Sequence, residues 1–283
     1  MKTKIFSTVF LFLFVITWSS YSAPRKMVLE FCTGTWCGWC PCGDEAAEQI
    51  LVTYPQTIVI AYHGASTDPW QNFNGNAIRS MLGFAGYPTG IFDRTNHPGN
   101  GSSYPWVTYD MWSSYASNRY NGTPNTQINV ALTNSSYNVN TRELNTSINA
   151  TALQDLTGQY KIVYVLTEDN VVYPQNFYAA CGTAGYHNDY VHKWIARSVI
   201  NNPNGENLNT GTWNQNLVIS RTVTTILDNA WVAENCHLNI IVYKDNVQGL
   251  FLSAVEQGAK LSVGNLVGIS GNNNQVPEAY YLS

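Results

Sequence analysis

The sequence predicts an α/β domain followed by an all-β domain, and three observations lead to this prediction. The chain has 283 residues, and at roughly 100–200 residues per domain this length favours two domains. Strand-like and helix-like segments alternate between residues 27 and 120, which is typical of β-α-β units and a partly parallel sheet. Asn121-Gly122-Thr123-Pro124 then interrupts the chain. After it the hydrophobic period changes to two, as expected of half-buried strands.

The elements of the first half follow from hydrophobic runs and turn residues. Residues 58–62 are apolar without interruption, as expected of a strand that is buried on both faces. Asp68-Pro69 is a helix-start signal, with the aspartate as N-cap and the proline at the first helical position. The expected order is a strand over 27–32, a helix over 44–54, a strand over 58–62, a helix from 68 to about 82, a strand over 89–93 and a helix over 106–120.

The second half predicts an antiparallel β-sandwich of immunoglobulin type. Its short alternating segments are separated by turn-rich stretches, which is the pattern of such sandwiches. The expected strands are 127–133, 143–151, 160–167, 192–200, 216–224, 238–244 and 249–255. We place a linker over 121–125, the sandwich over 126–263 and a C-terminal linker or tail over 264–283.

The composition excludes some functions. Charged residues make up only 11% of the chain and its net charge is −4. Affinity for phosphate backbones depends largely on lysine and arginine, so we expect no nucleic-acid partner. No P-loop or Rossmann fingerprint is present in the sequence, and we expect no cofactor.

The N-terminus predicts a signal peptide over residues 1–22. Lys2 and Lys4 precede an apolar run over 5–18, and Ser20-Tyr21-Ser22 supplies small residues for cleavage. The first domain then covers residues 23–120. No second long apolar stretch follows, so we expect no transmembrane segment in the mature chain. Export would place the six cysteines in an oxidising compartment, where disulfides persist.

One motif carries redox chemistry. Trp36-Cys37-Gly38-Trp39-Cys40 follows a predicted strand and opens a helix. Unpaired N–H groups and the helix dipole stabilise a thiolate at such a position, which makes Cys37 the nucleophile and Cys40 the resolving thiol. Thiol–disulfide exchange would pass through a mixed disulfide on Cys37. The alternative is an inert disulfide that staples an exported domain.

Three stretches resemble a known family. Glu30-Phe31-Cys32-Thr33-Gly34-Thr35-Trp36-Cys37-Gly38-Trp39-Cys40-Pro41 is similar to the start of the Omp28-related family of exported bacterial proteins. Tyr87-Pro88-Thr89-Gly90-Ile91-Phe92-Asp93-Arg94 and Tyr186-His187-Asn188 also resemble that family. The resemblance implies a thioredoxin-like domain followed by an immunoglobulin-like domain. It implies much less about activity.

The thioredoxin pattern implies roles for four residues. Cys37 is the nucleophile, Cys40 is the resolving thiol and Pro88 is the cis-proline that faces them. Glu30 stands where thioredoxins keep a buried acid that helps to deprotonate the resolving thiol. The sequence departs from the pattern in the Gly-Trp pair between the cysteines and in a loop before Trp36 that is one residue longer.

The remaining cysteines leave several interpretations open. Cys32 and Cys42 flank the motif; they could form a disulfide or stay buried thiols, or Cys42 could act as a second resolving thiol. A C-x-x-C-x-C run can also hold zinc or iron–sulfur, although we favour no metal. In the second half we expect a structural disulfide between Cys181 and Cys236, which lie 55 residues apart.

The sequence therefore supports a main function and two alternatives. The main hypothesis is an exported thiol–disulfide oxidoreductase that acts on protein thiols, disulfides or a redox partner protein. The first alternative is a non-catalytic cell-surface binding or scaffold protein whose cysteine pair is structural. The second is a metal-binding role through Cys37, Cys40 and Cys42. The aromatic loop Trp70-Gln71-Asn72-Phe73, with Trp39, could offer an apolar platform for substrates, or it could be ordinary packing.

The C-terminus adds an expectation about location. Residues 276–283 resemble the lead-in to the sorting domains of the type IX secretion system. This resemblance implies a chain that is secreted or attached to the cell surface, with the type IX machinery as a partner. A periplasmic location is the alternative.

Overall fold

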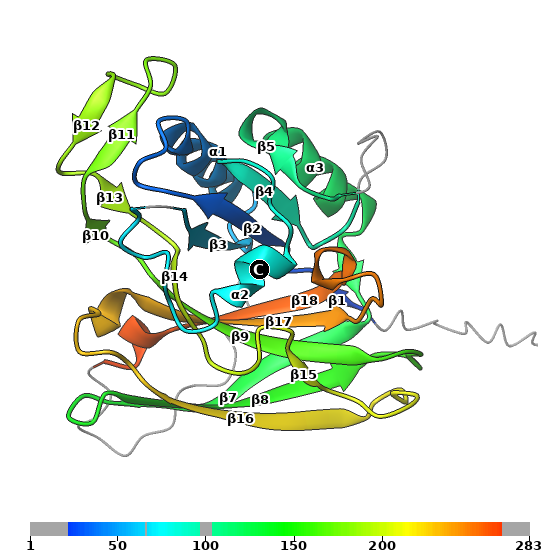
Figure 1. Ribbon diagram of the computed structural model, residues 1–283. Coiled ribbons are helices and arrows are strands. Elements are labelled where there is room, and N and C mark those ends of the chain that lie inside the picture. The colour runs from blue at the N-terminus through cyan, green and yellow to red at the C-terminus, as the bar shows by residue number, and fades with distance from the viewer. Residues whose placement is uncertain (1–21, 66, 97–103, 268–283) are drawn as a thin grey trace, which may run out of the picture.

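The computed structural model describes residues 22–65, 67–96 and 104–267. The C-terminal motif lies outside these ranges, and so does the predicted signal peptide apart from Ser22. In the described part, the two longer helices lie over one half of a large sheet and a smaller sheet lies under its other half (Figure 1). The α-helices are α1 (Cys40–Thr53), α2 (Ala77–Met81) and α3 (Trp112–Gly122).

The large sheet contains strands from both halves of the sequence. Its order is β18-β17-β9-β14-β3-β2-β4-β5, with β15 also paired to β9. β2 runs parallel to β3 and antiparallel to β4. Its strands are β2 (Val28–Thr33), β3 (Ile58–His63), β4 (Thr89–Phe92), β5 (Val107–Thr108), β9 (Tyr160–Glu168), β14 (Ile195–Val199), β15 (Glu206–Asn207), β17 (Cys236–Lys244) and β18 (Val255–Ser262).

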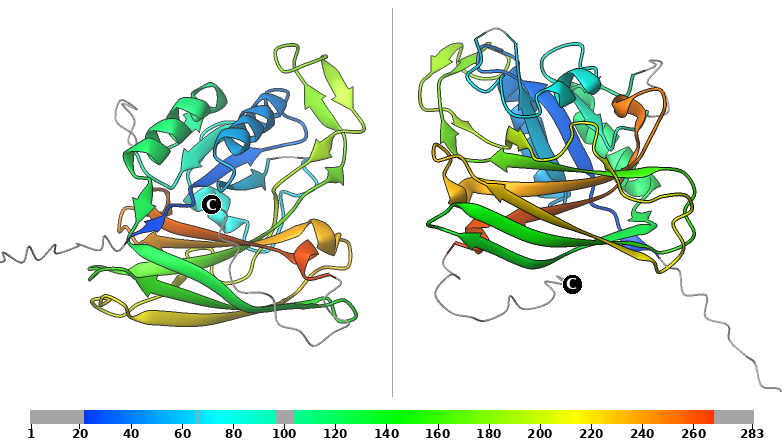
Figure 2. Two further views of the ribbon diagram at one scale, coloured as in Figure 1. Left: turned by 180° about the vertical axis from the view of Figure 1, so that it is seen from behind. Right: turned by 60° about the horizontal axis from the view of Figure 1, so that its bottom comes forward.

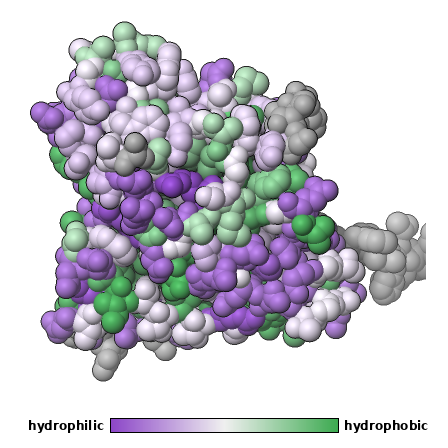
Figure 3. All heavy atoms as spheres, viewed as in Figure 1, coloured by the Kyte–Doolittle hydropathy of each residue, from purple (hydrophilic) through white to green (hydrophobic). Residues whose placement is uncertain are grey.

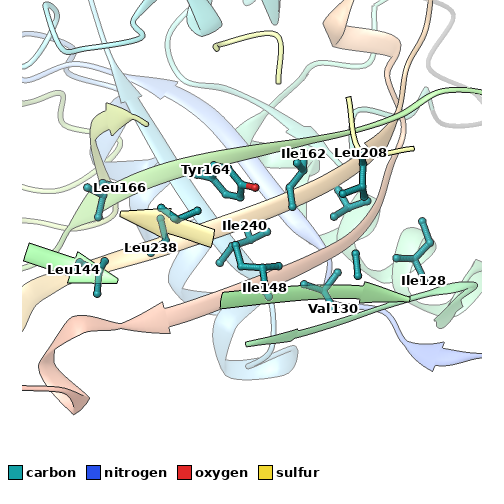
Figure 4. Close-up of a cluster of buried hydrophobic side chains, with 14 of the residues drawn as sticks. Ile128, Val130, Leu144, Ile148, Ile162, Tyr164, Leu166, Leu208, Leu238 and Ile240 are labelled. Carbon is teal, nitrogen blue, oxygen red and sulfur yellow. The ribbon is translucent and has the colours of Figure 1, made fainter. Parts of the chain in front are cut away.

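The smaller sheet has the order β16-β8-β7 and packs on the β9–β17 half of the large sheet. Its strands are β7 (Ile128–Asn138), β8 (Glu143–Ala152) and β16 (Val218–Ile226). Burial alternates along the whole of β8, because successive side chains of a strand point to opposite faces. The inward side chains, among them Ile148, meet Ile162 and Ile240 of the large sheet in one hydrophobic core (Figure 4).

Two further cores lie on the β2–β3 half of the large sheet. On one face, Phe31 packs with Ile50 of α1 and Trp112 of α3, and the view from behind shows these two helices covering the sheet (Figure 2). On the other face, Ile60 shares a core with Val163 of β9. That core therefore joins the two halves of the sequence.

Short paired strands complete the described part. β1 (Ala23–Pro24) pairs with β6 (Asn125–Thr126). β10 (Val171–Val172) pairs with β13 (Val191–His192), and β11 (Gln175–Phe177) pairs with β12 (Gly185–His187). The last two pairs form an arm over residues 171–192, which rises beside the N-terminal end of α1 (Figure 1).

The predicted fold class, an α/β thioredoxin-like domain plus an all-β immunoglobulin-like sandwich, is wrong. Strands outnumber helices in the described residues, and the strands of the first half do not form a sheet of their own. β14 pairs in parallel with β3, with Ile195 opposite Ala61, and continues the sheet into β9 and β17. Local periodicity shows that a segment is a buried strand but not which distant segment it pairs with. The predicted domain boundaries stay a prediction.

Three predicted elements also differ from the structure. The helix expected over 106–120 begins only at α3, because its first residues form β5 and a 3-10 turn (Tyr109–Met111). The helix expected from residue 68 is replaced by a loop, and only Ala77–Met81 is helical. Asp68 does accept the backbone N–H of Trp70, as a capping residue would, but it also binds Thr35 and His63 and so serves the loop. The strand expected over 249–255 is a 3-10 turn (Leu250–Leu252) that precedes β18.

Candidate functional site

The cysteine motif forms a disulfide at the turn between β2 and α1. Cys37 donates its backbone N–H to the Gly34 carbonyl, and Cys40 donates to the Cys37 carbonyl. These turns bring the two Cα atoms to 5.4 Å, which is within the normal range for a disulfide. Pro41 sits in the first turn of α1, where its missing N–H costs no intrahelical hydrogen bond. We call the Cys37–Cys40 bond the inner disulfide.

The inner disulfide is buried. Cys37 is 4% exposed and Cys40 is fully buried. Thiol–disulfide exchange requires a thiolate to reach one of the two sulfurs. The described conformation therefore keeps external thiols away from this bond.

A segment of the arm covers the turn that carries the inner disulfide. We call residues 175–181 the strap. Asn176 donates its backbone N–H to the Thr35 carbonyl at 2.9 Å, and Tyr178 donates to the Gly38 carbonyl at 2.8 Å. A Cβ atom at Gly38 would lie only 2.5 Å from the Tyr178 ring, so the ring lies directly on this glycine.

Side chains of the strap add further hydrogen bonds. The buried Gln175 amide donates to the carbonyls of Gly34 and Cys37, at 3.3 and 2.9 Å. The Asn176 amide donates to the Trp36 carbonyl at 3.1 Å. The strap therefore donates hydrogen bonds to the backbone carbonyls of all the successive turn residues 34–38.

A second disulfide fixes the strap to α1. Cys42, in the first turn of the helix, is bonded to Cys181, 139 residues later in the chain. We call this bond the outer disulfide; both of its cysteines are partly exposed. Tyr190 also donates to the Asp44 carboxylate at 2.7 Å, and Lys193 contacts Glu48 at 2.6 Å. Burial raises the pKa of Asp44 to about 7.

The predicted Cys181–Cys236 disulfide is wrong. Cys236 lies buried at the start of β17 as a free thiol, whereas the arm carries Cys181 to α1. Cys32 is the other free thiol, buried on β2 with its Sγ 2.9 Å from the Gly86 carbonyl. Burial raises the pKa of Cys32 to about 11 and that of Cys236 to about 12. Burial and a raised pKa are typical of structural cysteines.

One sequence signal could have indicated the outer pair. Cys40 and Cys42 are two residues apart on a helix, so their side chains point to different sides. Cys42 therefore needs a partner outside the motif. Cys236 lies just before the strand predicted over 238–244, whereas Cys181 lies in a loop rich in glycine and tyrosine. A loop can approach the helix more easily than a central strand can.

Pro88 lies near the motif, but Glu30 is engaged elsewhere. The Tyr87–Pro88 bond is cis, and a Cβ atom at Gly43 of α1 would lie 2.9 Å from the Pro88 ring. Glu30 shares the face of β2 that is turned away from α1, where its carboxylate accepts two bonds from Arg94, at 2.7 and 2.9 Å. The catalytic roles assigned to Cys37, Cys40, Pro88 and Glu30 stay predictions.

The aromatic loop over residues 70–73 is largely packed. The Trp70 ring contacts His63 and His192, and Arg197 lies over it at 5.4 Å. Phe73 stacks on Tyr62 at 6.2 Å. A cavity of about 560 Å³ opens between residues 69–70, 72–74, 196–198, 226–229 and 231. These contacts support the packing interpretation of the loop.

Three exposed aromatic side chains lie at the strap, its paired strand and the turn that it covers, whereas the exposed Tyr104 contacts Phe251 elsewhere. Trp39 is 41% exposed, Tyr178 is 49% exposed and Tyr186 is 64% exposed. The Trp39 ring contacts Tyr178 edge-on at 5.5 Å. The upper part of the surface, over the helices and the arm, is mostly pale in Figure 3, as weakly polar residues are, while stronger hydrophilic colour lies lower.

The described residues contain neither a cluster of side chains that could hold a metal ion nor a helix that could span a membrane. Within residues 22–65, 67–96 and 104–267, no group of three or more His, Cys, Asp or Glu side chains has the geometry of a metal site. In the same ranges, no helix combines the length and hydrophobicity needed to cross a bilayer.

Comparisons with known proteins identify relatives. The family model "Outer membrane protein Omp28" matches residues 75–265, which include the strap but not the cysteine motif. The structure is similar to HBP35 of Porphyromonas gingivalis, with a TM-score of 0.65 and 15% identity over 84% of this chain and 75% of that one. No curated protein sequence is significantly similar to the chain.

A second solved structure matches more weakly. It is a domain of the outer membrane lipoprotein Omp28 from Porphyromonas gingivalis, with a TM-score of 0.30 and 14% identity. The match covers 48% of this chain and 88% of that one. At these identities the similarity to HBP35 concerns the fold alone.

Proposed function

Because the chain belongs to the outer membrane protein Omp28 family, we propose that it is an exported, non-catalytic binding or scaffold protein at the cell surface. In this proposal the Cys37–Cys40 disulfide is structural. One observation carries it: the inner disulfide is buried under the strap, and the outer disulfide holds the strap in place. An oxidoreductase needs its nucleophilic sulfur within reach of a substrate in each cycle.

The electrostatics around the motif support the same function. An oxidoreductase keeps a reactive cysteine partly exposed in an environment that stabilises its thiolate. Here the acid proposed to assist Cys40 is neutralised by Arg94 and accepts a further bond from Tyr62. None of the described hydrogen bonds of the Glu30 carboxylate is made with a thiol.

The family and the disulfides both support the proposed location. The family is one of outer membrane proteins, and two disulfides persist best outside the cytosol. The exposed tyrosines and tryptophan around the strap are residue types that are enriched at protein interfaces. We therefore place the contact surface of the proposed binding function at this end of the molecule.

The proposal is tested by turnover with a disulfide substrate. The mature protein is incubated with insulin and dithiothreitol, and insulin precipitation is followed against thioredoxin as a positive control, over the interval in which alkylation shows the Cys42–Cys181 disulfide still intact. Cys37→Ser/Cys40→Ser is the matched variant. We expect the wild type and the variant to give the same rate as dithiothreitol alone. A wild-type rate that clearly exceeds that of the variant would establish an oxidoreductase instead.

A further inference from the structure

The two disulfides differ in their access to solvent. Both sulfurs of the inner bond belong to buried residues, whereas Cys42 and Cys181 are partly exposed. The outer sulfurs have only weak contacts with the protein: Cys42 Sγ lies 3.8 Å from the Ala180 carbonyl, and Cys181 Sγ lies 3.8 Å from the Trp39 carbonyl. An external thiol therefore reaches the outer bond first.

The strap makes access to the inner bond depend on the outer one. The strap hydrogen-bonds to the turn on both sides of Cys37, at Thr35 and at Gly38. Its far end is held by the outer disulfide. While that bond is intact, a strap that opens locally stays tethered to the first turn of α1 and closes again. Once the bond is broken, only hydrogen bonds and ring contacts keep the strap in place, and local opening becomes more frequent.

We propose that the Cys42–Cys181 disulfide is a redox modification site, at which an external dithiol acts first and thereby exposes the inner disulfide. The inference rests on the proposed function, because it takes the inner pair as unreactive while the strap is closed. The partner is a dithiol, either a small molecule or an exported protein with a reduced cysteine pair. Reduction of the outer disulfide would let the strap move together with its exposed aromatic side chains. The redox state would therefore regulate the proposed contact surface.

The reaction is an ordinary two-electron exchange. A thiolate of the dithiol attacks Cys181 Sγ, the Cys42–Cys181 bond breaks, and Cys42 leaves as a thiolate. The second thiol of the dithiol then displaces Cys181. The dithiol is oxidised to a disulfide, and the two protein sulfurs are reduced and take up its two protons. Cys42 is the better leaving group because the N-terminus of α1 stabilises its thiolate.

The order of reduction is measured on the wild-type protein. Dithiothreitol is added under native conditions, samples are alkylated at intervals, and each cysteine is quantified by peptide mass spectrometry, while near-ultraviolet circular dichroism reports on folding. We expect Cys42 and Cys181 to be labelled well before Cys37 and Cys40. With glutathione in place of dithiothreitol, the adduct is expected on Cys181 and the free thiol on Cys42. Simultaneous reduction of both bonds would overturn the proposal.

Variants test whether the outer disulfide keeps the inner disulfide inaccessible. We call this protection the lock. In Cys42→Ser/Cys181→Ser, which leaves the inner pair intact, we expect the inner disulfide to be reduced at least about tenfold faster, as a gain of 1.4 kcal/mol in local opening would give. Tyr190→Phe is the control, since it removes the hydrogen bond to Asp44 but keeps both disulfides. We expect its inner disulfide to react at the wild-type rate. Equal rates in all three proteins would refute the lock.

A measurement without variants covers the case in which the double variant does not fold. The outer pair of the wild type is reduced briefly and alkylated, and amide exchange is then followed at Asn176 and Tyr178, which donate to the turn. Faster exchange supports the lock, and unchanged exchange contradicts it. These results are independent of insulin turnover, so failure of this inference and failure of the proposed function are distinguishable.

Discussion

Glu30 places a carboxylate inside the large sheet, and Arg94 neutralises it. Both side chains are essentially inaccessible, and they are joined by two hydrogen bonds. Tyr62 donates a third bond to the same carboxylate at 2.9 Å, and the Arg94 guanidinium also lies over the Tyr243 ring at 4.8 Å. A buried ion pair of this kind fixes geometry more than it adds stability.

Removing one partner of this pair is therefore expected to be costly. Arg94→Met leaves the Glu30 charge buried without a counterion, and we expect the free energy of unfolding to fall by about 3–5 kcal/mol. Glu30→Leu/Arg94→Met removes both charges and should lose clearly less. Urea unfolding measures both variants. A double variant that is as unstable as the single one would contradict this account of Glu30.

The buried His192 side chain is expected to make the protein less stable in acid. Burial lowers its pKa to about 3 from an ordinary value of 6.5. Above pH 6.5 the ring is neutral in both states and adds no pH dependence. Between pH 6.5 and about 3 the unfolded chain binds a proton that the folded chain does not, so the free energy of unfolding falls as the pH falls.

The size of this effect is accessible through a variant without the titrating ring. Each proton taken up on unfolding changes the free energy of unfolding by about 1.4 kcal/mol per pH unit. From pH 6.5 to 5, the wild type should lose about 2 kcal/mol more than His192→Gln. Urea unfolding at the two pH values gives the comparison. Equal losses would show that His192 is protonated in the folded protein.

At the scale of elements, the strap explains the glycine between the cysteines. Gly38 has no Cβ, and its carbonyl accepts a hydrogen bond from Tyr178, whose ring covers it. The turn and the strap therefore fit each other through a residue that could be taken, from the sequence, for part of a redox motif. The preceding turn is similarly tight, since a Cβ atom at Gly34 would lie 2.6 Å from the Trp36 indole.

Gly38→Ala tests that fit. The added methyl group would overlap the Tyr178 ring, so we expect the strap to shift and the amides of Asn176 and Tyr178 to exchange faster with solvent. Gly122→Ala is the matched control, because nothing lies within 4 Å of a Cβ atom at that position. Its strap amides should exchange as in the wild type. Protected strap amides in Gly38→Ala would show that the ring does not hold the strap.

The sequence predicted most elements but not the contacts between them. The strands β2, β3, β8 and β17 could be predicted because burial on one or both faces of a strand produces a recognisable hydrophobic pattern in the sequence. Asp68 misled the helix prediction, since a capping residue binds loop N–H groups equally well. The arm escaped notice because its strands, two or three residues long, are too short to show a period.

At the scale of the molecule, the large sheet joins the two halves of the chain. β14 lies between β3 and β9, and Ile60, Val163 and Ile241 share one core. The sequence predicted two separate domains because a strand in the interior of a sheet has the same apolar pattern whichever strands flank it. The partner of β3 was decided by a segment more than 130 residues further along the chain.

A truncated chain tests this dependence. A fragment over residues 23–126 keeps β2, β3, β4 and the three helices but loses β14, β9 and β17. It would expose one edge of β3 and the apolar face of Ile58, Ile60 and Val28. We expect it to lack cooperative unfolding and sharp near-ultraviolet circular dichroism. A fragment that unfolds cooperatively would show that the first half is an independent domain.

The central claim is that the Cys37–Cys40 disulfide is a structural bond closed off in the native protein. The most direct measurement is its redox equilibrium in the folded wild type, by titration with dithiothreitol, alkylation and peptide mass spectrometry of each cysteine. We predict that the inner pair stays oxidised to below about −300 mV for as long as the outer disulfide and the native circular dichroism persist. Reversible titration of Cys37 and Cys40 between about −120 and −270 mV with the outer disulfide intact would contradict it.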